Sequence, residues 1–176
     1  MKITDEEIFD VVDACDNVIG QASRAEVHSK GLFHRAIHVF VFNEEEEIFL
    51  QRRSLVKDVA PGLWSSSCSG HVDSGETYEE AAHRELVEEI FLTVHAGQLD
   101  WTLMASPCTA TENEFVRLYR CRSSQLLKTD PLEIMDSCWI NRTELGRWMQ
   151  GKPEDFSPSF LHLYALETLV SPLAST

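Results

Sequence analysis

The segment GHVDSGETYEEAAHRELVEEI, residues 70–90, constrains this chain more than any other stretch, because it concentrates carboxylates in a predicted helix. Helix-forming residues dominate its second half, and apolar residues recur there at helical spacing. Positions i, i+3 and i+4 lie on one face of a helix, so Glu85, Glu88 and Glu89 project into one small volume. Three like charges at this spacing repel one another when no cation lies between them.

Two structures satisfy this pattern: a binding site for a divalent cation, or a helix whose charged face is solvated. Hard divalent ions such as Mg²⁺ prefer oxygen ligands, keep several waters and complete their coordination with substrate phosphates. A run such as RELVEE alone is equally compatible with a solvated surface. The loop that precedes the helix decides between the two interpretations.

The loop and the helix together resemble the signature of the Nudix hydrolases, G-x5-E-x7-R-E-U-x-E-E-x-G-U. Gly70, Glu76 and the run at 84–89 stand at the specified gaps, and Leu92 supplies the last apolar position. Phe91 is the exception, since it stands where the family has glycine. A match of this length with fixed gaps is far more specific than a short glycine motif. A glycine after a helix permits a left-handed C-cap. Phenylalanine adopts that conformation only at a higher energetic cost.

The resemblance implies an α/β fold, an α/β/α sandwich with a mixed sheet and flanking helices. It also implies a hydrolase that cleaves the diphosphate of a small molecule to a monophosphate product with Mg²⁺ or Mn²⁺ as cofactor. The implied metal-binding set is Gly70, through its carbonyl oxygen, with Glu85, Glu88 and Glu89. Arg84 matches the arginine that pairs with the loop glutamate, here Glu76, and so braces the loop against the helix.

A second resemblance extends over most of the chain. The stretches FHRAIHVFVFN, LQRRSLVKDVAPGLWSSSCSGH, ENEF and DFSPSF resemble the branch that contains isopentenyl-diphosphate isomerase and its hydrolase relatives. His34 and His71 fall on two metal histidines of the isomerase, and His28 lies one position from the third. Glu112 and Glu114 fall on its two metal glutamates. A mixed nitrogen and oxygen ligand set of this kind suits Zn²⁺ or Mn²⁺ as well as Mg²⁺.

The same resemblance assigns two further roles. Arg53 and Lys57 fall on basic residues that bind the substrate diphosphate. In some Nudix enzymes a glutamate outside the helix activates the water, so Glu85 and Glu114 are alternative candidates for the catalytic base.

The residue at position 69 distinguishes the hydrolase pattern from the isomerase pattern. The isomerase has its catalytic cysteine immediately before the glycine, whereas here Cys68 is displaced by one position. Neighbours in an extended chain point to opposite faces, so the thiol is expected to point away from the site. The complete set of helix glutamates also favours the hydrolase. An isomerase is the first alternative, and a catalytically silent nucleotide-binding regulator, for which Phe91 leaves room, is the second.

Local patterns predict the remaining elements. Thr77 followed three residues later by Glu80 predicts a capping box. His38 lies within a predicted strand and is interpreted as a packed core histidine. Predicted elements are a hairpin at 8–23, strands at 36–43, 48–53 and 115–121, and C-terminal helices within 143–170. Substrate specificity is expected in loops, chiefly 93–114 and 122–136.

Length, charge and cysteine content limit the domain number, the partners and the location that we expect for this chain. A length of 176 residues predicts one Nudix domain, 1–176, with the terminal elements as its extensions. The net charge of −14 argues against a nucleic acid polymer as partner. No apolar run approaches the roughly 18 residues of a membrane span, and the acidic N-terminus does not read as a signal peptide. Five cysteines without a CxxC pair favour reduced thiols and a cytoplasmic location. A homodimer is compatible with the resemblance.

Overall fold

A mixed seven-stranded sheet forms the centre of the computed structural model, which describes residues 7–95 and 97–170. Its strand order is β5-β4-β3-β8-β7, with β6 paired to β3 and β9 paired to β4. Only the β3–β8 pair is parallel among these pairs. The strands are β3 (His34–Phe42), β4 (Ile48–Arg53), β5 (Trp64–Ser65), β6 (Cys68–His71), β7 (Asp100–Ala105), β8 (Glu114–Arg122) and β9 (Ile134–Ile140).

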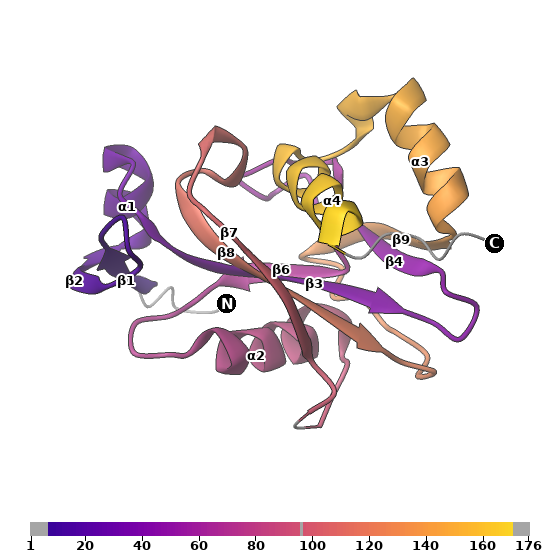
Figure 1. Ribbon diagram of the computed structural model, residues 1–176, viewed down its shortest axis with the longest axis horizontal. Coiled ribbons are helices and arrows are strands. Elements are labelled where there is room, and N and C mark those ends of the chain that lie inside the picture. The colour runs from indigo at the N-terminus through magenta and orange to yellow at the C-terminus, as the bar shows by residue number, and fades with distance from the viewer. Residues whose placement is uncertain (1–6, 96, 171–176) are drawn as a thin grey trace.

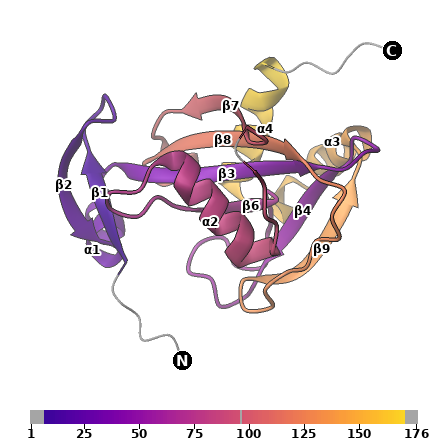
Figure 2. The ribbon, with the colours of Figure 1, turned by 90° about the horizontal axis from the view of Figure 1, so that it is seen from below.

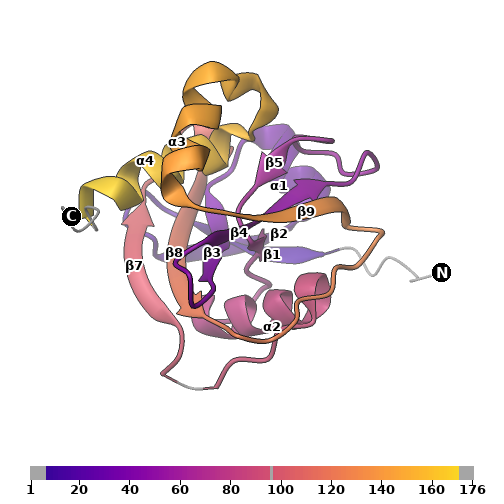
Figure 3. The same ribbon diagram turned by 90° about the vertical axis from the view of Figure 1, so that its right-hand side faces the viewer.

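Helices cover both faces of this sheet, which gives the α/β/α layering expected from the sequence (Figure 1). Helix α2 lies on one face, and α3 and α4 lie on the other (Figure 3). The helices are α1 (Arg24–Lys30), α2 (Tyr78–Ile90), α3 (Arg142–Gly151) and α4 (Pro158–Val170), with the short 3₁₀ turns η1 (Thr109–Thr111) and η2 (Pro153–Asp155). No helix of the described ranges is long and apolar enough to cross a membrane.

Strand β3 divides the core because its side chains alternate between the two faces of the sheet. Ile37, Val39 and Val41 pack in the cluster that contains the apolar face of α2. Phe40 and Phe42 pack in the opposite cluster, with the buried side chains of α4. The central strands are packed between these two cores. This packing positions the polar side chains of β3, β6 and β8.

A small N-terminal unit stands at one end of the sheet (Figure 2). Strands β1 (Ile8–Val12) and β2 (Val18–Ser23) form an antiparallel hairpin, and α1 follows directly. The sequence interpretation did not identify α1. The sequence nevertheless contains residues typical of both helix ends. The Ser23 side chain accepts a hydrogen bond from the Glu26 backbone N–H, and Gly31 ends the helix in the left-handed region at φ 61°.

The segment 93–114 is not the continuous loop that the sequence interpretation assigned, because β7 lies within it and pairs with β8. Likewise, β9 begins within 122–136 and pairs with β4. Strand β7 is at the edge of the sheet, and its Trp101 is 62% exposed. An edge strand with exposed apolar side chains lacks the clean alternation by which a half-buried strand is recognised.

One end of α2 agrees with the local sequence, and the other adopts a conformation that its residue disfavours. The predicted capping box is confirmed: the Thr77 side chain accepts from the Glu80 backbone N–H, and the Glu80 side chain accepts from the Thr77 backbone N–H. At the other end Phe91 adopts the left-handed conformation at φ 52°, although it is not glycine. Its ring is 59% exposed, so little packing compensates this conformation.

Replacing Phe91 by glycine is therefore expected to stabilise the protein. A left-handed residue with a side chain is strained by roughly 1–2 kcal/mol, and the greater flexibility of unfolded glycine offsets part of that. We expect Phe91→Gly to raise the free energy of unfolding by about 0.5–1 kcal/mol in urea titrations. Phe91→Ala keeps the left-handed residue and serves as the control. An equal gain in both variants would attribute the effect to removal of the ring.

Candidate active site

Arg84 fixes the loop before α2 against the helix. Its guanidinium donates to both carboxylate oxygens of Glu76, at 3.0 and 2.8 Å, and to the carbonyl of His71 at 3.0 Å. A bidentate arginine–carboxylate pair constrains geometry as well as charge. The same guanidinium lies 2.5 Å from Glu85 and 3.7 Å from Glu88. The pairing of Glu76 with Arg84 thus connects the loop to the carboxylate-bearing face of α2.

Two of the helix glutamates lie next to each other: Glu89 is buried, and the Glu85 side chain is 14% exposed. Burial, followed by repulsion from Glu89, raises the pKa of Glu85 to about 8, against the opposing effect of Arg84. Burial also raises the pKa of Glu89, whose carboxylate accepts from Gln51 Nε2 at 3.0 Å and from the Ser69 backbone N–H at 3.2 Å. A pair of largely buried carboxylates fits a divalent cation, which would neutralise both.

Glu88 lies at the mouth of the same cleft, with its side chain 51% exposed. The three helix glutamates line this cleft together with Gly70 and acidic residues that sequence reasoning missed, namely Glu7, Asp73, Asp130 and Glu133. A Cβ at Gly70 would lie 2.2 Å from the carboxyl carbon and one oxygen of Glu85. Glycine is therefore needed to keep the Glu85 carboxylate in this position, because the carboxylate occupies the space of a side chain.

Gly70→Ala is expected to displace the Glu85 carboxylate and lower activity. A misplacement of about 1 Å near the reacting groups costs on the order of 10²-fold in rate. We therefore expect a fall of about 10²-fold in kcat/KM for the hydrolysis that the sequence resemblance predicts, measured by phosphate release. Gly20→Ala is the matched control, since a Cβ there meets no atom within 4 Å. Full activity in the Gly70→Ala variant would mean that the position of Glu85 does not matter.

A second cluster contains imidazoles and carboxylates. His28, His34 and His71 bring one ring nitrogen each to within 4.8 Å of one another. Glu114 Oε1 lies 3.1 Å from His71 Nε2 and 3.4 Å from His34 Nε2. Glu112 Oε2 lies 3.7 Å from His28 Nδ1. The parallel pairing of β3 with β8 places His34 directly beside Glu114, so these groups meet although they are far apart in sequence.

This cluster also fits a metal ion. The Nε2 atoms of His28 and His34 are buried. Among the described residues, His28 Nε2 has no hydrogen-bond partner and His34 Nε2 has only the 3.4 Å contact with Glu114. Buried polar atoms of this kind are rare unless a ligand satisfies them. The histidines hold the pKa of the Glu114 carboxyl well below its usual range despite its burial, and burial lowers the pKa of His28. An ionised carboxylate beside imidazole nitrogens is a donor set that suits a metal ion.

His28 belongs to this cluster even though its position is offset by one from the pattern it resembles. It lies on α1, and residues 31–33 connect that helix to β3. A hydrogen bond from the Leu32 backbone N–H to the Val27 carbonyl closes the connection. The connection accommodates the offset, because a short loop and not a continuous strand joins His28 to His34.

Basic side chains line the space next to both clusters. Arg53 and Lys57 line one cavity, and Lys57 also lines the acidic cleft, where it is paired with Glu133. The Arg53 Nε donates to the Val59 carbonyl at 2.8 Å, which holds the guanidinium in place. Arg24, from the helix that the sequence interpretation missed, lines both spaces as well.

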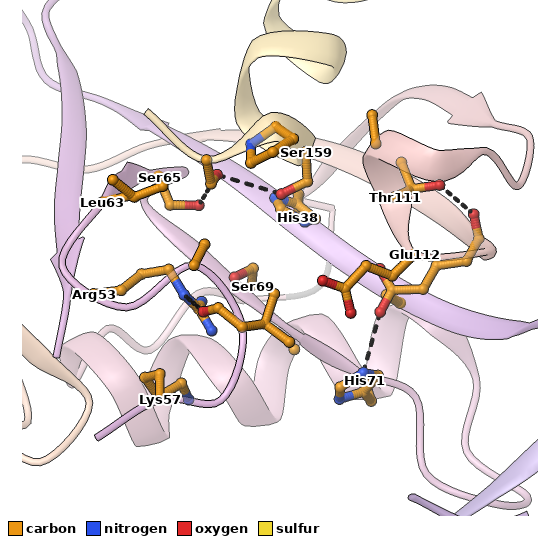
Figure 4. Close-up of a pocket in the computed structure, with 18 of the residues that line it drawn as sticks. His38, Arg53, Lys57, Leu63, Ser65, Ser69, His71, Thr111, Glu112 and Ser159 are labelled. Carbon is orange, nitrogen blue, oxygen red and sulfur yellow. Dashed lines mark hydrogen bonds and ion pairs between the residues drawn. The ribbon is translucent and has the colours of Figure 1, made fainter. Parts of the chain in front are cut away.

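The cavity lies between the metal-ligand candidates and α4, and it encloses about 350 Å³ (Figure 4). Ser69, Gly70 and His71 of β6 form the wall that it shares with the acidic cleft. Ser69 lines the cavity, whereas the Cys68 side chain is fully buried in the core beside α2. Burial raises the pKa of this thiol well above its usual range. The thiol is thus on the opposite side of β6 from the cavity.

Fold and site together define an α/β domain with a charged cleft beside two clusters of metal-ligand candidates. A model of the NUDIX domain family matches residues 32–163. The chain is 32% identical to "Isopentenyl-diphosphate Delta-isomerase 2" of Photorhabdus laumondii, over 88% of this chain and 89% of that protein. It is 35% identical to the uncharacterized Nudix hydrolase all7351 of Nostoc sp., over 85% of this chain and 89% of that one.

Solved structures agree. The protein DR0079 of Deinococcus radiodurans superposes with a TM-score of 0.71 at 30% identity, covering 82% of this chain and 90% of that one. The NUDIX domain of Shewanella oneidensis NrtR, solved with ADP ribose, has a TM-score of 0.60 at 16% identity, covering 87% and 100%. The chain therefore belongs to the Nudix family and is an enzyme of the Nudix hydrolase class.

Proposed function

We propose that this enzyme hydrolyses the diphosphate of a small molecule and leaves an organic monophosphate. The observation that carries the proposal is the adjacent pair of glutamates on α2, the largely buried Glu85 and the buried Glu89, beside a cavity lined by Arg53 and Lys57. The three helix glutamates and the Gly70 carbonyl would hold Mg²⁺, with Mn²⁺ as the substitute. The second cluster would hold a further ion through His28, His34, His71, Glu112 and Glu114.

When bound, divalent cations supply charge neutralisation of the phosphates and a more acidic water. Residues of the protein then bind the substrate phosphates and accept the proton of the water. Arg53 and Lys57 orient the phosphates, and Lys57 exchanges its pairing with Glu133 for a substrate oxygen. Glu85 or Glu114 accepts the proton of the attacking water. The water oxygen bonds to phosphorus as the bond to the bridging oxygen breaks, so inorganic phosphate and a monophosphate are released.

Isomerisation of isopentenyl diphosphate is the second candidate. It is favoured by the isomerase names among the relatives and by the cluster of three histidines and two glutamates. Ser69 argues against it, because a serine hydroxyl faces the cavity where that reaction uses a thiol. The neighbouring thiol of Cys68 lies in the opposite core and is held protonated.

A panel of diphosphate compounds with Mg²⁺ or Mn²⁺ tests these candidates, with phosphate release as the first readout. Isopentenyl diphosphate belongs in the panel, and its products are checked for a shifted double bond. Metal-dependent phosphate release supports the hydrolase. A shifted double bond would establish the isomerase instead. Binding without any turnover would establish the catalytically silent nucleotide-binding regulator.

Two properties of the whole protein belong to the same proposal. We place the enzyme in the cytoplasm, since its five cysteines are all free thiols, which suits a reducing compartment. A homodimer stays a prediction, and light scattering after size-exclusion chromatography tests it.

A further inference from the structure

The cavity has two sides of different chemistry (Figure 4). Lys57 and His71 lie along one side, next to the metal-ligand candidates. Ser65 and Ser159 lie along the opposite side, below the start of α4. The first side carries charged or ionisable groups suited to phosphate. The second side presents neutral hydrogen-bonding groups, and its chemistry therefore concerns the part of the ligand that is not phosphate.

The serines on that second side are held in place by a third serine. Ser157 Oγ donates to Ser65 Oγ at 3.1 Å and lies 3.3 Å from Ser159 Oγ. It also accepts from the Phe160 backbone N–H at 3.2 Å, which ties it to the first turn of α4. A hydroxyl offers one donor and two acceptor sites. Ser65 and Ser159 thus retain hydrogen-bonding capacity that a ligand in the cavity can use.

His38 adds a neutral imidazole to the same wall. It is 5% exposed, as expected for a core histidine, yet it lines the cavity beside Ser69, its partner in the β3–β6 ladder. Its Nδ1 lies 2.6 Å from Ser66 Oγ, so the other ring nitrogen remains for a ligand. Burial lowers the pKa of His38 to about 4. At neutral pH the ring therefore offers a hydrogen bond and not a positive charge.

The remaining lining excludes two kinds of ligand group. No Phe, Tyr or Trp side chain lines the cavity within the described ranges, so a nucleobase has no aromatic ring to stack on. An isoprenoid chain would dehydrate the hydroxyls and the imidazole without replacing their hydrogen bonds to water. The apolar part of the lining consists of aliphatic residues, namely Ala36, Val59, Ala60, Leu63, Ala110 and Pro158. At about 350 Å³ the cavity is at the small end of ligand pockets.

We propose that this wall, formed by His38, Ser65 and Ser159, binds the hydroxyl groups of a compact aliphatic moiety, so that the substrate is a sugar or polyol diphosphate. The inference rests on the proposed hydrolase function, which places the diphosphate at the charged side. It adds the chemical class of the group attached to that diphosphate. A site built to hydrogen-bond hydroxyls discriminates strongly against analogues that lack them.

The test compares three diphosphates with Mg²⁺: ribose 5-diphosphate, isopentenyl diphosphate and cytidine diphosphate. Both kcat/KM by phosphate release and Kd by calorimetry are measured. Ribose 5-diphosphate is expected to exceed the other two at least tenfold in kcat/KM. Ser159→Ala is expected to reduce about tenfold the ratio of kcat/KM for ribose 5-diphosphate to kcat/KM for isopentenyl diphosphate. A change of this size corresponds to the loss of one hydrogen bond. Ser124→Ala, on an exposed serine outside the cavity, is the matched control.

The outcomes separate this inference from the function on which it rests. Equal or better hydrolysis of isopentenyl diphosphate would overturn the hydroxyl-binding wall and leave the hydrolase standing. Equal or better hydrolysis of cytidine diphosphate, which carries the same ribose hydroxyls, would overturn the compact sugar or polyol as the substrate class. Absence of any phosphate release, with preferential binding of ribose 5-diphosphate that Ser159→Ala weakens, would support the wall and overturn the hydrolase. An unchanged preference in both Ser159→Ala and Ser65→Ala would overturn the wall whatever the turnover.

Discussion

Glu89→Gln is expected to lower metal-dependent hydrolysis by about 10³-fold, equivalent to roughly 4 kcal/mol of transition-state stabilisation. Glu89 is buried against Ser69 and Gln51, and its carboxylate lies beside Glu85. The amide oxygen of glutamine can accept the same two hydrogen bonds, so the fold is retained. The negative charge that a divalent cation requires is lost. Phosphate release at saturating substrate, over a Mg²⁺ titration, measures the effect.

The same variant is expected to be more stable than the wild type when no metal is present. The pKa of Glu89 is raised in the folded protein above the unfolded value of about 4.3, so ionisation opposes folding as pH rises. The gain from Glu89→Gln should therefore be larger at pH 8 than at pH 5. In the wild type, Mg²⁺ at about 100 times its Kd should add roughly 2.7 kcal/mol of stability, and the variant should lose that increment.

Thermal unfolding with and without Mg²⁺, at both pH values, measures these stabilities. Glu79→Gln is the matched control, because Glu79 lies on the same helix but is exposed and lines neither the cleft nor the cavity. A Glu89→Gln enzyme with normal activity and a normal Mg²⁺ response would remove Glu89 from the metal site.

The carboxylate face of α2 could be predicted from sequence because it depends on one helix. Helical periodicity places Glu85, Glu88 and Glu89 together without knowledge of any distant contact. Periodicity does not predict how exposed each carboxylate is. In the structure Glu85 and Glu89 are largely buried, whereas Glu88 is half exposed. That difference arises from the packing of α2 against β6, where the absent side chain of Gly70 leaves room for one carboxylate.

The second cluster could not have been derived from local patterns. His34 meets Glu114 through a parallel strand pair, and His28 arrives on a helix that was not identified. Only the family resemblance brought these residues together. The cavity wall shows the same limit, since His38 is buried as expected but its contact with the cavity depends on the position of α4. Specificity was expected in 93–114 and 122–136. Residues 109–112 and Glu114 of the first range do line the cavity, whereas Ser159 lies outside both ranges.

Glu114→Gln is expected to lower activity by about 10³-fold, within the range of roughly 10²–10⁴ contributed by a general base. Glu114 bridges His34 and His71, and those histidines keep its carboxyl ionised. Neutralising it would weaken metal binding at this cluster without altering the glutamates of α2. The variant is therefore expected to contain fewer transition-metal ions per protein by elemental analysis, while it keeps the Mg²⁺ response of the wild type.

Comparison with Glu112→Gln separates the two roles of this cluster. Glu112 is more exposed and lies 3.7 Å from His28, so its loss is expected to reduce metal content with a smaller fall in rate. If Glu114 is the base, its variant should stay slow when the metal is restored at high concentration, whereas Glu112→Gln should recover. If Glu85 is the base, both variants should recover with added metal, because Glu114 would then act only as a ligand.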